Sequence, residues 1–384
     1  MHLRVLLALG LCPMLARAAD RPTIPPPTAR ERDAYIRRGR VWQETDVESK
    51  DLYNGPEGEL TFAPDEEIRC TFVPKALAGW TEKFLCQLDD GRVFKVKYNE
   101  GDRYKEAVGE VLGTRLFWAL GFYADKMLPV RVTCRNCPRR PWTYVNARVN
   151  RYNLDKDGLI RTLPPDAERG TYTFDLAVIE EPLDAAIIER RPEEGWTWSS
   201  LETVDPKLGG ATRAEIDALK LLSAFVENAD NSAQQNTLAC PRAEIVTNDD
   251  GRTTCRRPIL YVDDLGAVFG EGGFTSRYAG RVDYLGWKSA PVWKSRHSRR
   301  AHLAAIGWGI KPSTMKDPII CEEGRALLAK QLERLSDRQI ADLFRAARID
   351  RLGQATVEDW VRLFKLKRDE ILEHTGCAAS RRAD

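Results

Sequence analysis

Four charged side chains in the first third of the sequence occur at spacings that suit the binding of phosphate groups. Lys95 and Lys97 lie in the segment 94–98, which is predicted to be a strand, so both lysines share one face. Glu106 and Glu110 follow on a predicted helix and lie one turn apart on the same side. A strand lysine can neutralise phosphate oxygens, and a helix glutamate can hold that lysine in place.

Two later segments carry groups suited to transferring a phosphoryl group. Asp230 and Gln235 lie in a polar loop directly after a long predicted helix, and Asp264 follows the apolar segment 259–262. A loop aspartate orients the accepting hydroxyl, while a second carboxylate and an amide oxygen further along the loop bind Mg²⁺. These residue types therefore favour ATP- and Mg²⁺-dependent phosphoryl transfer to a hydroxyl.

The four segments, in this order, resemble the protein-kinase-like superfamily. The nearest likeness is to its atypical branches, the phosphatidylinositol 3-/4-kinase-like proteins and the secretory-pathway kinases, and it covers residues 60–270 by motif. The resemblance implies that Lys97 binds the phosphates of ATP and that Glu110 is its helix partner. It also implies that Asp230 is the catalytic-loop aspartate and that Asp264, in an Asp-Leu-Gly sequence, binds Mg²⁺.

Two of these assignments have rivals within the same segments. Lys95 shares the strand face of Lys97, so either lysine can be the one that binds phosphate. Glu106 shares the helix face of Glu110, so either glutamate can be its partner. The register of the predicted helix against the predicted strand decides between them.

The loop that contains Asp230 departs from the family pattern Asp-x-Lys-x-x-Asn. Ser232 and Gln235 stand at the lysine and asparagine positions, and Asn236 is the neighbour that could supply the amide instead. The extra methylene of Gln displaces its oxygen, and Mg²⁺ tolerates little departure from ideal geometry. No Gly-x-Gly-x-x-Gly sequence precedes Lys97. The alternative function is therefore a pseudokinase, a catalytically silent extracellular module that binds a partner.

The elements that must position these residues change in type along the chain. Strands are expected at 68–73, 84–88, 93–98, 127–133 and 171–179, with a helix over 104–120 and a Cys/Pro loop after 133. Helices are expected at 211–228, 325–335, 337–347 and 357–374. Strands early and helices late indicate an α+β fold, a two-lobed protein-kinase-like fold with a β-rich N-lobe at 60–145 and a mostly helical C-lobe at 146–384.

The first residues predict export. Residues 1–18 have a basic start, a short apolar run and the small-x-small sequence Ala16-Arg17-Ala18, which is typical of a signal peptide. Residues 19–59 are expected to form a Pro-rich extended leader. No later segment is long and apolar enough to cross a membrane, so the expected location is secreted or periplasmic.

Composition limits the class of partner. The chain has 384 residues with 59 Lys+Arg and 57 Asp+Glu, and 43% of its residues are hydrophobic, as in globular proteins. Removing residues 1–18 takes away Arg4 and Arg17, so 59 − 2 leaves 57 basic against 57 acidic residues. A chain of zero net charge has no overall attraction for nucleic acid. The expected partners are a nucleotide and an unidentified protein, lipid or glycan acceptor.

The even number of cysteines left after export indicates disulfide bonds. Cys240 and Cys255 flank the turn 248–251, which would bring two strands together. Cys70 and Cys86 bracket a similar stretch. Sequence alone does not prove these pairings.

The pair Cys134 and Cys137 fits a redox motif, half of a zinc site or a structural disulfide. A redox motif needs its first cysteine at the start of a helix, which the nearby Pro138 and Pro141 disfavour. A zinc site needs a second pair at suitable spacing, which the sequence lacks. A structural disulfide is the favoured interpretation.

Three other patterns receive weaker interpretations. Residues 153–160 match half of a calcium loop, but Pro164 stands where the bidentate glutamate belongs. The basic stretch 288–302, with Trp287 and Trp293, is either a solvated loop or a surface that grips phosphate or an acidic partner. No Gly-x-Ser-x-Gly sequence occurs, so a hydrolase triad has little support.

Overall fold

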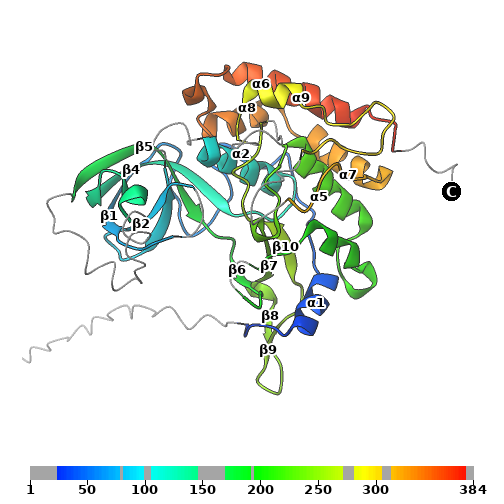
Figure 1. The fold of residues 1–384 in the computed structure, drawn as a ribbon, viewed down its shortest axis with the longest axis horizontal. Coiled ribbons are helices and arrows are strands. Elements are labelled where there is room, and N and C mark those ends of the chain that lie inside the picture. Colours follow the sequence, from blue (N-terminus) through cyan, green and yellow to red (C-terminus); the bar gives the residue numbers. More distant parts are fainter. Residues whose placement is uncertain are drawn as a thin grey trace, which may run out of the picture.

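The structure is a computed structural model, shown as a ribbon in Figure 1. It describes residues 24–77, 81–98, 105–145, 169–191, 194–270, 281–304 and 313–377. The predicted signal peptide and the calcium-loop-like segment 153–160 lie outside the described residues. Strands and helices are both present, so the α+β class predicted from sequence agrees with the structure.

Five strands close into a barrel on one side of the molecule (Figure 1). They are β1 (Glu67–Val73), β2 (Lys83–Gln87), β3 (Val93–Lys97), β4 (Lys126–Pro138) and β5 (Arg169–Glu181). Their order around the barrel is β1-β2-β3-β5-β4, and β1 runs parallel to β4 while the other neighbours are antiparallel. Because β5 pairs with both β3 and β4, the β-rich part extends past the predicted boundary at residue 145 to Glu181.

The alternation of side chains divides the barrel wall into two faces. Phe84 on β2 lies opposite Val96 on β3, and both are buried in the barrel interior. Lys83 lies opposite Lys97 in the same ladder, so both lysines belong to the other face of the wall. Apolar residues therefore fill the barrel while charged residues of β3 face outward.

Two disulfides lie in the barrel. Cys70 and Cys86 join β1 to β2, and Cys134 is bonded to Cys137 within β4. The loop predicted after residue 133 is therefore wrong, because β4 continues to Pro138 and pairs with β5 throughout. An irregularity in the pairing between the two cysteines of β4 accommodates the short disulfide ring without ending the strand.

Helix α2 (Lys105–Ala119) follows the barrel's third strand, and nearly all of its residues are buried. It packs against β4 of the barrel on one side and against helix α8 on another. Gly121, with φ of +90°, ends the helix; a Cβ there would lie 2.3 Å from the backbone oxygen of Gln43. The helix is thus enclosed between the strands and the helical part of the chain.

The long helices of the second half begin at capping boxes or at a cysteine cap. They are α5 (Arg213–Phe225), α7 (Glu322–Glu333), α8 (Asp337–Ala346) and α9 (Val357–Leu372). Thr212, Ser336 and Thr356 each accept a hydrogen bond from the third residue of the following helix, whose side chain bonds back to the cap. Figure 1 shows these helices and the shorter α6 (Tyr284–Ser289) gathered beside the barrel.

A small sheet and a β-hairpin lie in the lower centre of the view in Figure 1. The sheet has the order β10 (Ile259–Val262), β7 (Asn236–Pro241) and β6 (Ala185–Ile187), and the hairpin pairs β8 (Ile245–Thr247) with β9 (Thr253–Cys255). The Cys240–Cys255 disulfide joins the two. Short 3-10 helices occupy Trp198–Thr203, Pro206–Leu208, Ala233–Gln235, Arg242–Glu244 and Ile349–Leu352.

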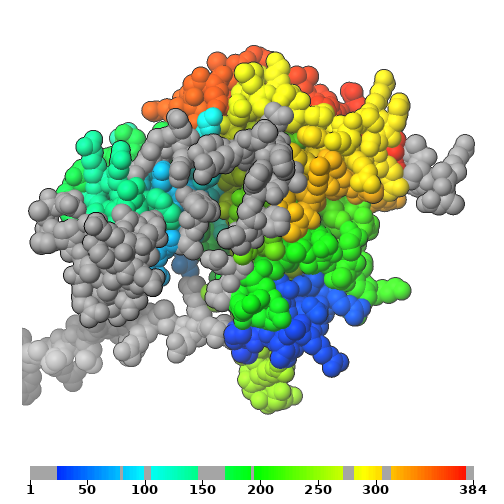
Figure 2. All heavy atoms as spheres, viewed as in Figure 1, coloured from blue at the N-terminus to red at the C-terminus, as the bar shows by residue number. Residues whose placement is uncertain are grey.

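The predicted extended leader 19–59 is wrong over part of its length. Residues Ala29–Arg37 form helix α1, because Thr28 and Glu31 make a capping box and Tyr35 and Ile36 supply a buried face. The following residues pack into the core. Figure 2 shows α1 as part of the molecular surface rather than as a free arm.

The largest apolar cluster joins α2 with the helices and the small sheet, and a separate cluster fills the barrel. Trp196, Trp198, Trp287 and Trp360 are fully buried. Among the described residues, no helix combines the length and the apolar character needed to cross a membrane.

Candidate functional site

Lys97 is buried between two carboxylates. Its Nζ lies 2.6 Å from Oε1 of Glu110 on α2 and 2.8 Å from Oε2 of Glu180 on β5. The Lys97 side chain is 8% exposed and the Glu110 side chain 1% exposed. The strand lysine and the helix glutamate chosen from sequence therefore form an ion pair, and a second glutamate that sequence reasoning did not select joins them.

The electrostatics of this cluster assign a charge to each group. Burial lowers the pKa of Lys97, but the nearby carboxylates outweigh burial and raise the pKa well above its usual value. Burial raises the pKa of Glu180, yet Lys97 and Lys95 bring the pKa down to about 2, so Glu180 is ionised. Burial raises the pKa of Glu110 to about 7, because Asp264 and Glu180 oppose the effect of Lys97. Lys97 is thus the cation and Glu180 its permanent counter-ion.

The rival residues have other partners. Lys95 pairs with Glu180, and Glu106 pairs with Arg281. Because Glu106 points to Arg281 rather than to Lys97, the structure has the helix register that pairs Lys97 with Glu110. Lys95 remains part of the cluster through the shared Glu180.

Asp264 lies beside this cluster, in the segment that follows β10. Gly266 N–H donates to Asp264 Oδ1 at 3.0 Å. A Cβ on Gly266 would lie 3.2 Å from that oxygen and 3.4 Å from Oε1 of Glu110, so the two carboxylates flank the same glycine. The charge of Asp264 contributes to the raised pKa of both Lys97 and Glu110. The lysine, the helix glutamate and the third carboxylate therefore converge from three separate elements.

Two glycines of α2 allow this convergence. A Cβ on Gly109 would lie 2.3 Å from the backbone oxygen of Gly266, and a Cβ on Gly113 would lie 2.7 Å from Cβ of Leu265. Only glycine permits so close an approach of helix and chain. Their spacing of one turn is a signal that sequence reasoning could have used, since it marks a helix face that meets another backbone.

Asp263, next to Asp264 in the chain, belongs to a second buried acidic pair. Its carboxylate accepts hydrogen bonds from Asp125 and from the Tyr261 hydroxyl. Burial, together with the charge of Asp263, raises the pKa of Asp125 well above its usual value, so Asp125 is the protonated partner. Asp125 also accepts from the Leu183 N–H at 2.8 Å. Asp263 is therefore engaged in this buried acidic pair. Asp264 is the carboxylate that lies with Glu110 beside Gly266.

The predicted catalytic loop is tied to the Asp263–Asp264 segment through its backbone. The carbonyl of Gln235 accepts from the Asp263 N–H at 2.9 Å and from the Asp264 N–H at 3.3 Å. The Gln235 side-chain amide donates to Asp230 Oδ2 at 3.1 Å. Asp230, Gln235 and Asp264 are therefore neighbours, as a shared site requires.

The side chain of Asn231 anchors this loop to the backbone of Thr314 and Met315. Its fully buried side chain accepts from the backbone of Thr314 and Met315 and donates to the carbonyls of Asn228 and Met315. These hydrogen bonds fix the backbone of the loop at the residue that follows Asp230. Sequence reasoning did not select Asn231, because its partners lie far along the chain.

The two departures from the family pattern have different surroundings. Ser232 is 2% exposed, so a buried hydroxyl stands where the family has a lysine. Asn236, the first residue of β7, donates to the carbonyl of Trp196 at 2.8 Å, so its amide is engaged there rather than with Asp230. Gln235 rather than Asn236 is therefore the amide beside Asp230.

The donor set suits a hard cation. Mg²⁺ binds carboxylate and amide oxygens and usually completes its shell with substrate phosphates and water. Asp264 and Gln235 carry such oxygens, and their backbones are hydrogen-bonded to each other. Within the described ranges, no cluster of three or more His, Cys, Asp or Glu side chains is arranged to hold a metal on its own. A metal here would need further ligands beyond these two side chains.

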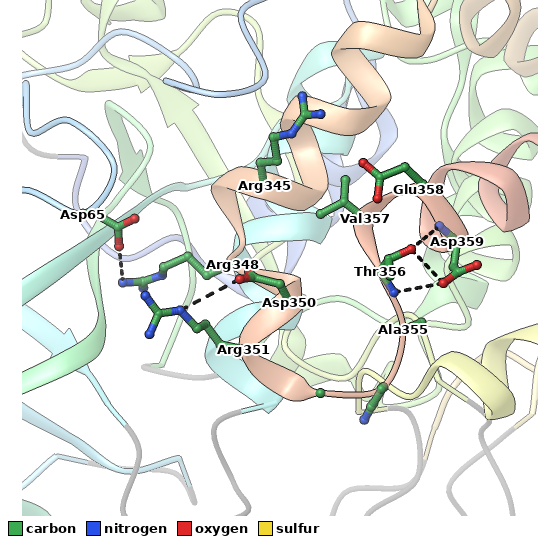
Figure 3. A pocket seen from close by; sticks show the side chains of 12 residues that line it. Asp65, Arg345, Arg348, Asp350, Arg351, Ala355, Thr356, Val357, Glu358 and Asp359 are labelled. Carbon is green, nitrogen blue, oxygen red and sulfur yellow. Dashed lines mark hydrogen bonds and ion pairs between the residues drawn. The ribbon is translucent and has the colours of Figure 1, made fainter.

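Two other predicted features lie away from this cluster. Trp287 and Trp293 of the basic stretch are buried, so they take part in packing rather than in a binding surface. A cavity of about 710 Å³, drawn in Figure 3, is lined by arginines and acids that include Arg345, Arg348 and Asp359. Arg345 pairs with Asp342, Arg348 with Asp65 and Asp359 with Arg362. These pairs do not belong to the Lys97 cluster.

Comparison with known proteins finds a likeness to solved structures but none to a sequence family. No family model matches the chain, and no curated protein matches its sequence. The chain is similar to the crystal structure of a proinflammatory kinase, CtkA, of Helicobacter pylori, with a TM-score of 0.41 and 9% identity over 81% of this chain and 95% of that one. A likeness this weak establishes neither family nor function.

Proposed function

We propose that the chain is an exported, two-lobed kinase-like protein that binds Mg·ATP between the barrel and the helical part and transfers a phosphoryl group to a hydroxyl. The observation that supports this most is the meeting of Lys97, Glu110 and Asp264 from β3, α2 and the segment after β10. The backbone bonds between Gln235 and the Asp263–Asp264 segment add the loop of Asp230 to the same place. Three disulfides agree with an oxidising compartment.

The residues of the site have distinct roles in this proposal. The Lys97 ammonium neutralises phosphate oxygens of the nucleotide, and Glu110 with Glu180 holds the ammonium in position. Asp230 orients the acceptor hydroxyl and accepts its proton as the hydroxyl oxygen bonds to phosphorus and the nucleoside diphosphate leaves. Mg²⁺, when held by Asp264 and Gln235, would neutralise charge on the phosphates.

The test is binding and turnover with Mg·ATP. A ligand that binds only the folded protein stabilises it by about 2.7 kcal/mol at a hundredfold excess over its Kd, so millimolar Mg·ATP should raise the Tm. Asp264→Ala should abolish the Mg²⁺-dependent part of that rise. Asp249→Ala, a change in the exposed turn of the β8–β9 hairpin, is the matched control and should leave the rise intact.

Turnover separates the loop aspartate from the metal ligand. Asp230→Ala should keep the thermal response to Mg·ATP and lose phosphoryl transfer, because its role is toward the acceptor. Gln235→Asn shortens the amide by one methylene and should strengthen the dependence on Mg²⁺. If neither the native chain nor Gln235→Asn responds to Mg·ATP, the kinase proposal fails.

The second candidate function is a catalytically silent module of the same fold. Two observations favour it: Lys97 is already satisfied by two carboxylates, and Ser232 replaces the family's loop lysine. A flat thermal response to Mg·ATP, combined with an intact fold by circular dichroism, would select this candidate.

A further inference from the structure

Two cysteines of the C-terminal region stand outside the three disulfides. Cys321 is the cap residue at the start of α7, and its Sγ accepts from the Gly324 N–H at 3.3 Å. Cys377, at the end of the described chain, is only 5% exposed.

The end of α9 lies against the first turn of α7. Arg325, one turn after Cys321, donates through Nη1 to the carbonyl of Ile371 at 2.8 Å and to that of Leu372 at 3.3 Å. Figure 1 shows the end of α9 beside α7. The chain that leads to Cys377 therefore starts next to the turn that Cys321 caps.

The residues after α9 continue along the segment 293–299. The His374 ring stacks on Trp293 with centroids 3.8 Å apart, and its Nε2 is hydrogen-bonded to the carbonyl of Ser298 at 2.8 Å. A Cβ on Gly376 would lie 2.8 Å from the carbonyl carbon of His297. The tail is thus held in contact with this segment up to the residue before Cys377.

The same segment leads directly to Cys321. The carbonyl of Arg299 accepts from the N–H of Ile320 at 2.9 Å, and Ile320 is the residue before Cys321. Both cysteines therefore adjoin one short stretch of chain, Cys377 through His297 and Cys321 through Arg299. Packing and hydrogen bonds together bring the two residues to the N-terminus of α7.

The electrostatic environment of the thiols agrees with this placement. Burial raises the pKa of Cys377 to about 11, and the charges of Glu322 and Cys321 act in the same direction. Burial and the neighbouring Asp217 raise the pKa of Cys321 to about 11 as well. Each thiol is therefore protonated at neutral pH, and Cys377 is within electrostatic reach of Cys321.

We propose that Cys321 and Cys377 form a fourth disulfide in the exported protein. The two thiols lose two protons and two electrons to form one S–S bond, and a disulfide-type oxidant of the compartment is reduced to two thiols. Rotation of the Cys321 side chain away from the Gly324 N–H is the change required on α7. The bond would close the chain around α7, α8 and α9.

Thiols with raised pKa values react slowly, because the thiolate is the attacking species. Once the chain has folded, formation of the fourth disulfide should therefore be slow. Its loop includes the C-terminal helices, and closing a longer loop removes more freedom from the unfolded chain. Reduction of this bond should loosen the tail first, together with the His374–Trp293 stack.

The test is differential alkylation of the full chain prepared without reductant. Unmodified thiols are alkylated in guanidinium, and the peptides are then mapped by mass spectrometry. We expect a cross-linked pair of peptides that contain Cys321 and Cys377, lighter by about 2 Da than the two reduced peptides together. Alkylation of both cysteines, with the other three disulfides intact, would overturn the proposal.

Variants that lack one of the two cysteines test the bond in a second way, which does not depend on how much of the native chain is correctly folded. In Cys321→Ser, Cys377 should become alkylated, and in Cys377→Ser, Cys321 should; the other three disulfides should be unaffected in both. Each variant should lower the Tm by several degrees relative to the oxidised native chain. Equal Tm values for oxidised native chain and variants, without the cross-linked peptides, would also contradict the bond.

Discussion

At the scale of single residues, Glu110 should give the protein a characteristic pH dependence. Its pKa is raised by burial from 4.5 to about 7, so the folded protein binds this proton more tightly than the unfolded chain. Stability therefore falls as the pH rises from about 4.5 to about 7, because the folded protein must release the proton it favours. A shift of this size corresponds to roughly 3 kcal/mol.

Glu110→Gln should remove that fall, because an amide does not titrate. Urea unfolding of the native chain and the variant at pH 5 and pH 8 measures the difference. We expect the variant to be less stable relative to the native chain at pH 5 than at pH 8. If the free energies of unfolding of the two proteins change equally between pH 5 and pH 8, Glu110 is ionised throughout, as a simple ion pair with Lys97 would require.

Glu180 should act in the opposite direction. Its pKa is lowered to about 2 by Lys97 and Lys95 against the effect of burial. Its contribution to stability is therefore fully present above the unfolded value of 4.5 and is lost as the pH falls toward 2. Because Glu180 also raises the pKa of Glu110, Glu180→Gln should move the Glu110 transition to lower pH in the same urea experiment.

Part of this site could be predicted from the sequence and part could not. Strand alternation and helix periodicity reduced the candidates to Lys95 or Lys97 and to Glu106 or Glu110. The family resemblance favoured Lys97 and Glu110. Glu180 becomes a partner only because β5 pairs with β3, a contact between distant parts of the chain. Asp125 and Asp263 meet for the same kind of reason. Periodicity describes one element at a time and contains no information on such meetings.

At the scale of elements, the position of α2 depends on its glycines. Gly109→Ala should raise the intrinsic helix propensity by about 1 kcal/mol, yet its new Cβ would lie 2.3 Å from the backbone oxygen of Gly266. The clash involves backbone, which cannot turn aside. We expect net destabilisation of about 1–3 kcal/mol in urea unfolding and loss of any Mg·ATP response, since Glu110 and Asp264 are pushed apart.

Whether Gly109→Ala lowers or raises the stability shows whether α2 is pressed against the Asp264 segment. Thr114→Ala, on the same helix, removes a methyl group and the hydroxyl that donates to the Glu110 carbonyl but adds no atom. It serves as the control for a change in α2 without a clash. If Gly109→Ala instead stabilised the protein, helix α2 would not be pressed against the Asp264 segment, and the site geometry would be incorrect.

The elements themselves were predicted unevenly. The α2, α5, α8 and α9 helices have clear apolar periodicity or caps, and their predicted ranges overlap the observed ones closely. Helix α1 was missed because four prolines dominate the composition just before it, although its capping box was present in the sequence. The membership of β5 in the barrel was missed because closure of a barrel depends on non-local pairing.

At the scale of the whole molecule, Arg348 joins the C-terminal helices to the barrel. It is 4% exposed and follows α8. Its Nη1 donates to the carbonyls of Val130 and Asp175 and to Asp65, and its Nη2 donates to the carbonyl of Ala177. One side chain therefore ties β4 and β5 to the region in which the helices end.

Arg348→Ala should destabilise the protein more than a surface change does. The buried carbonyls that it satisfies would lose their donors, and losing one partner of a buried charged network costs about 3–5 kcal/mol. Arg351→Ala is the control, because that side chain is 62% exposed and its contact with Asp350 is 3.9 Å, so a change within about 0.5 kcal/mol is expected.

Urea unfolding followed by two probes shows whether Arg348 couples the two parts of the molecule. Tryptophan fluorescence reports mainly on the helical part, where Trp287 and Trp360 are buried, and hydrogen exchange of the barrel strands reports on the other part. In the native chain the two transitions should coincide, because the parts share the Arg348 contacts. In Arg348→Ala the barrel should open at lower urea than the helices, since the contacts of Arg348 with β4 and β5 are then lost. Coincident transitions in the variant, shifted together, would mean that the remaining contacts are sufficient for coupling and that Arg348 contributes only to stability.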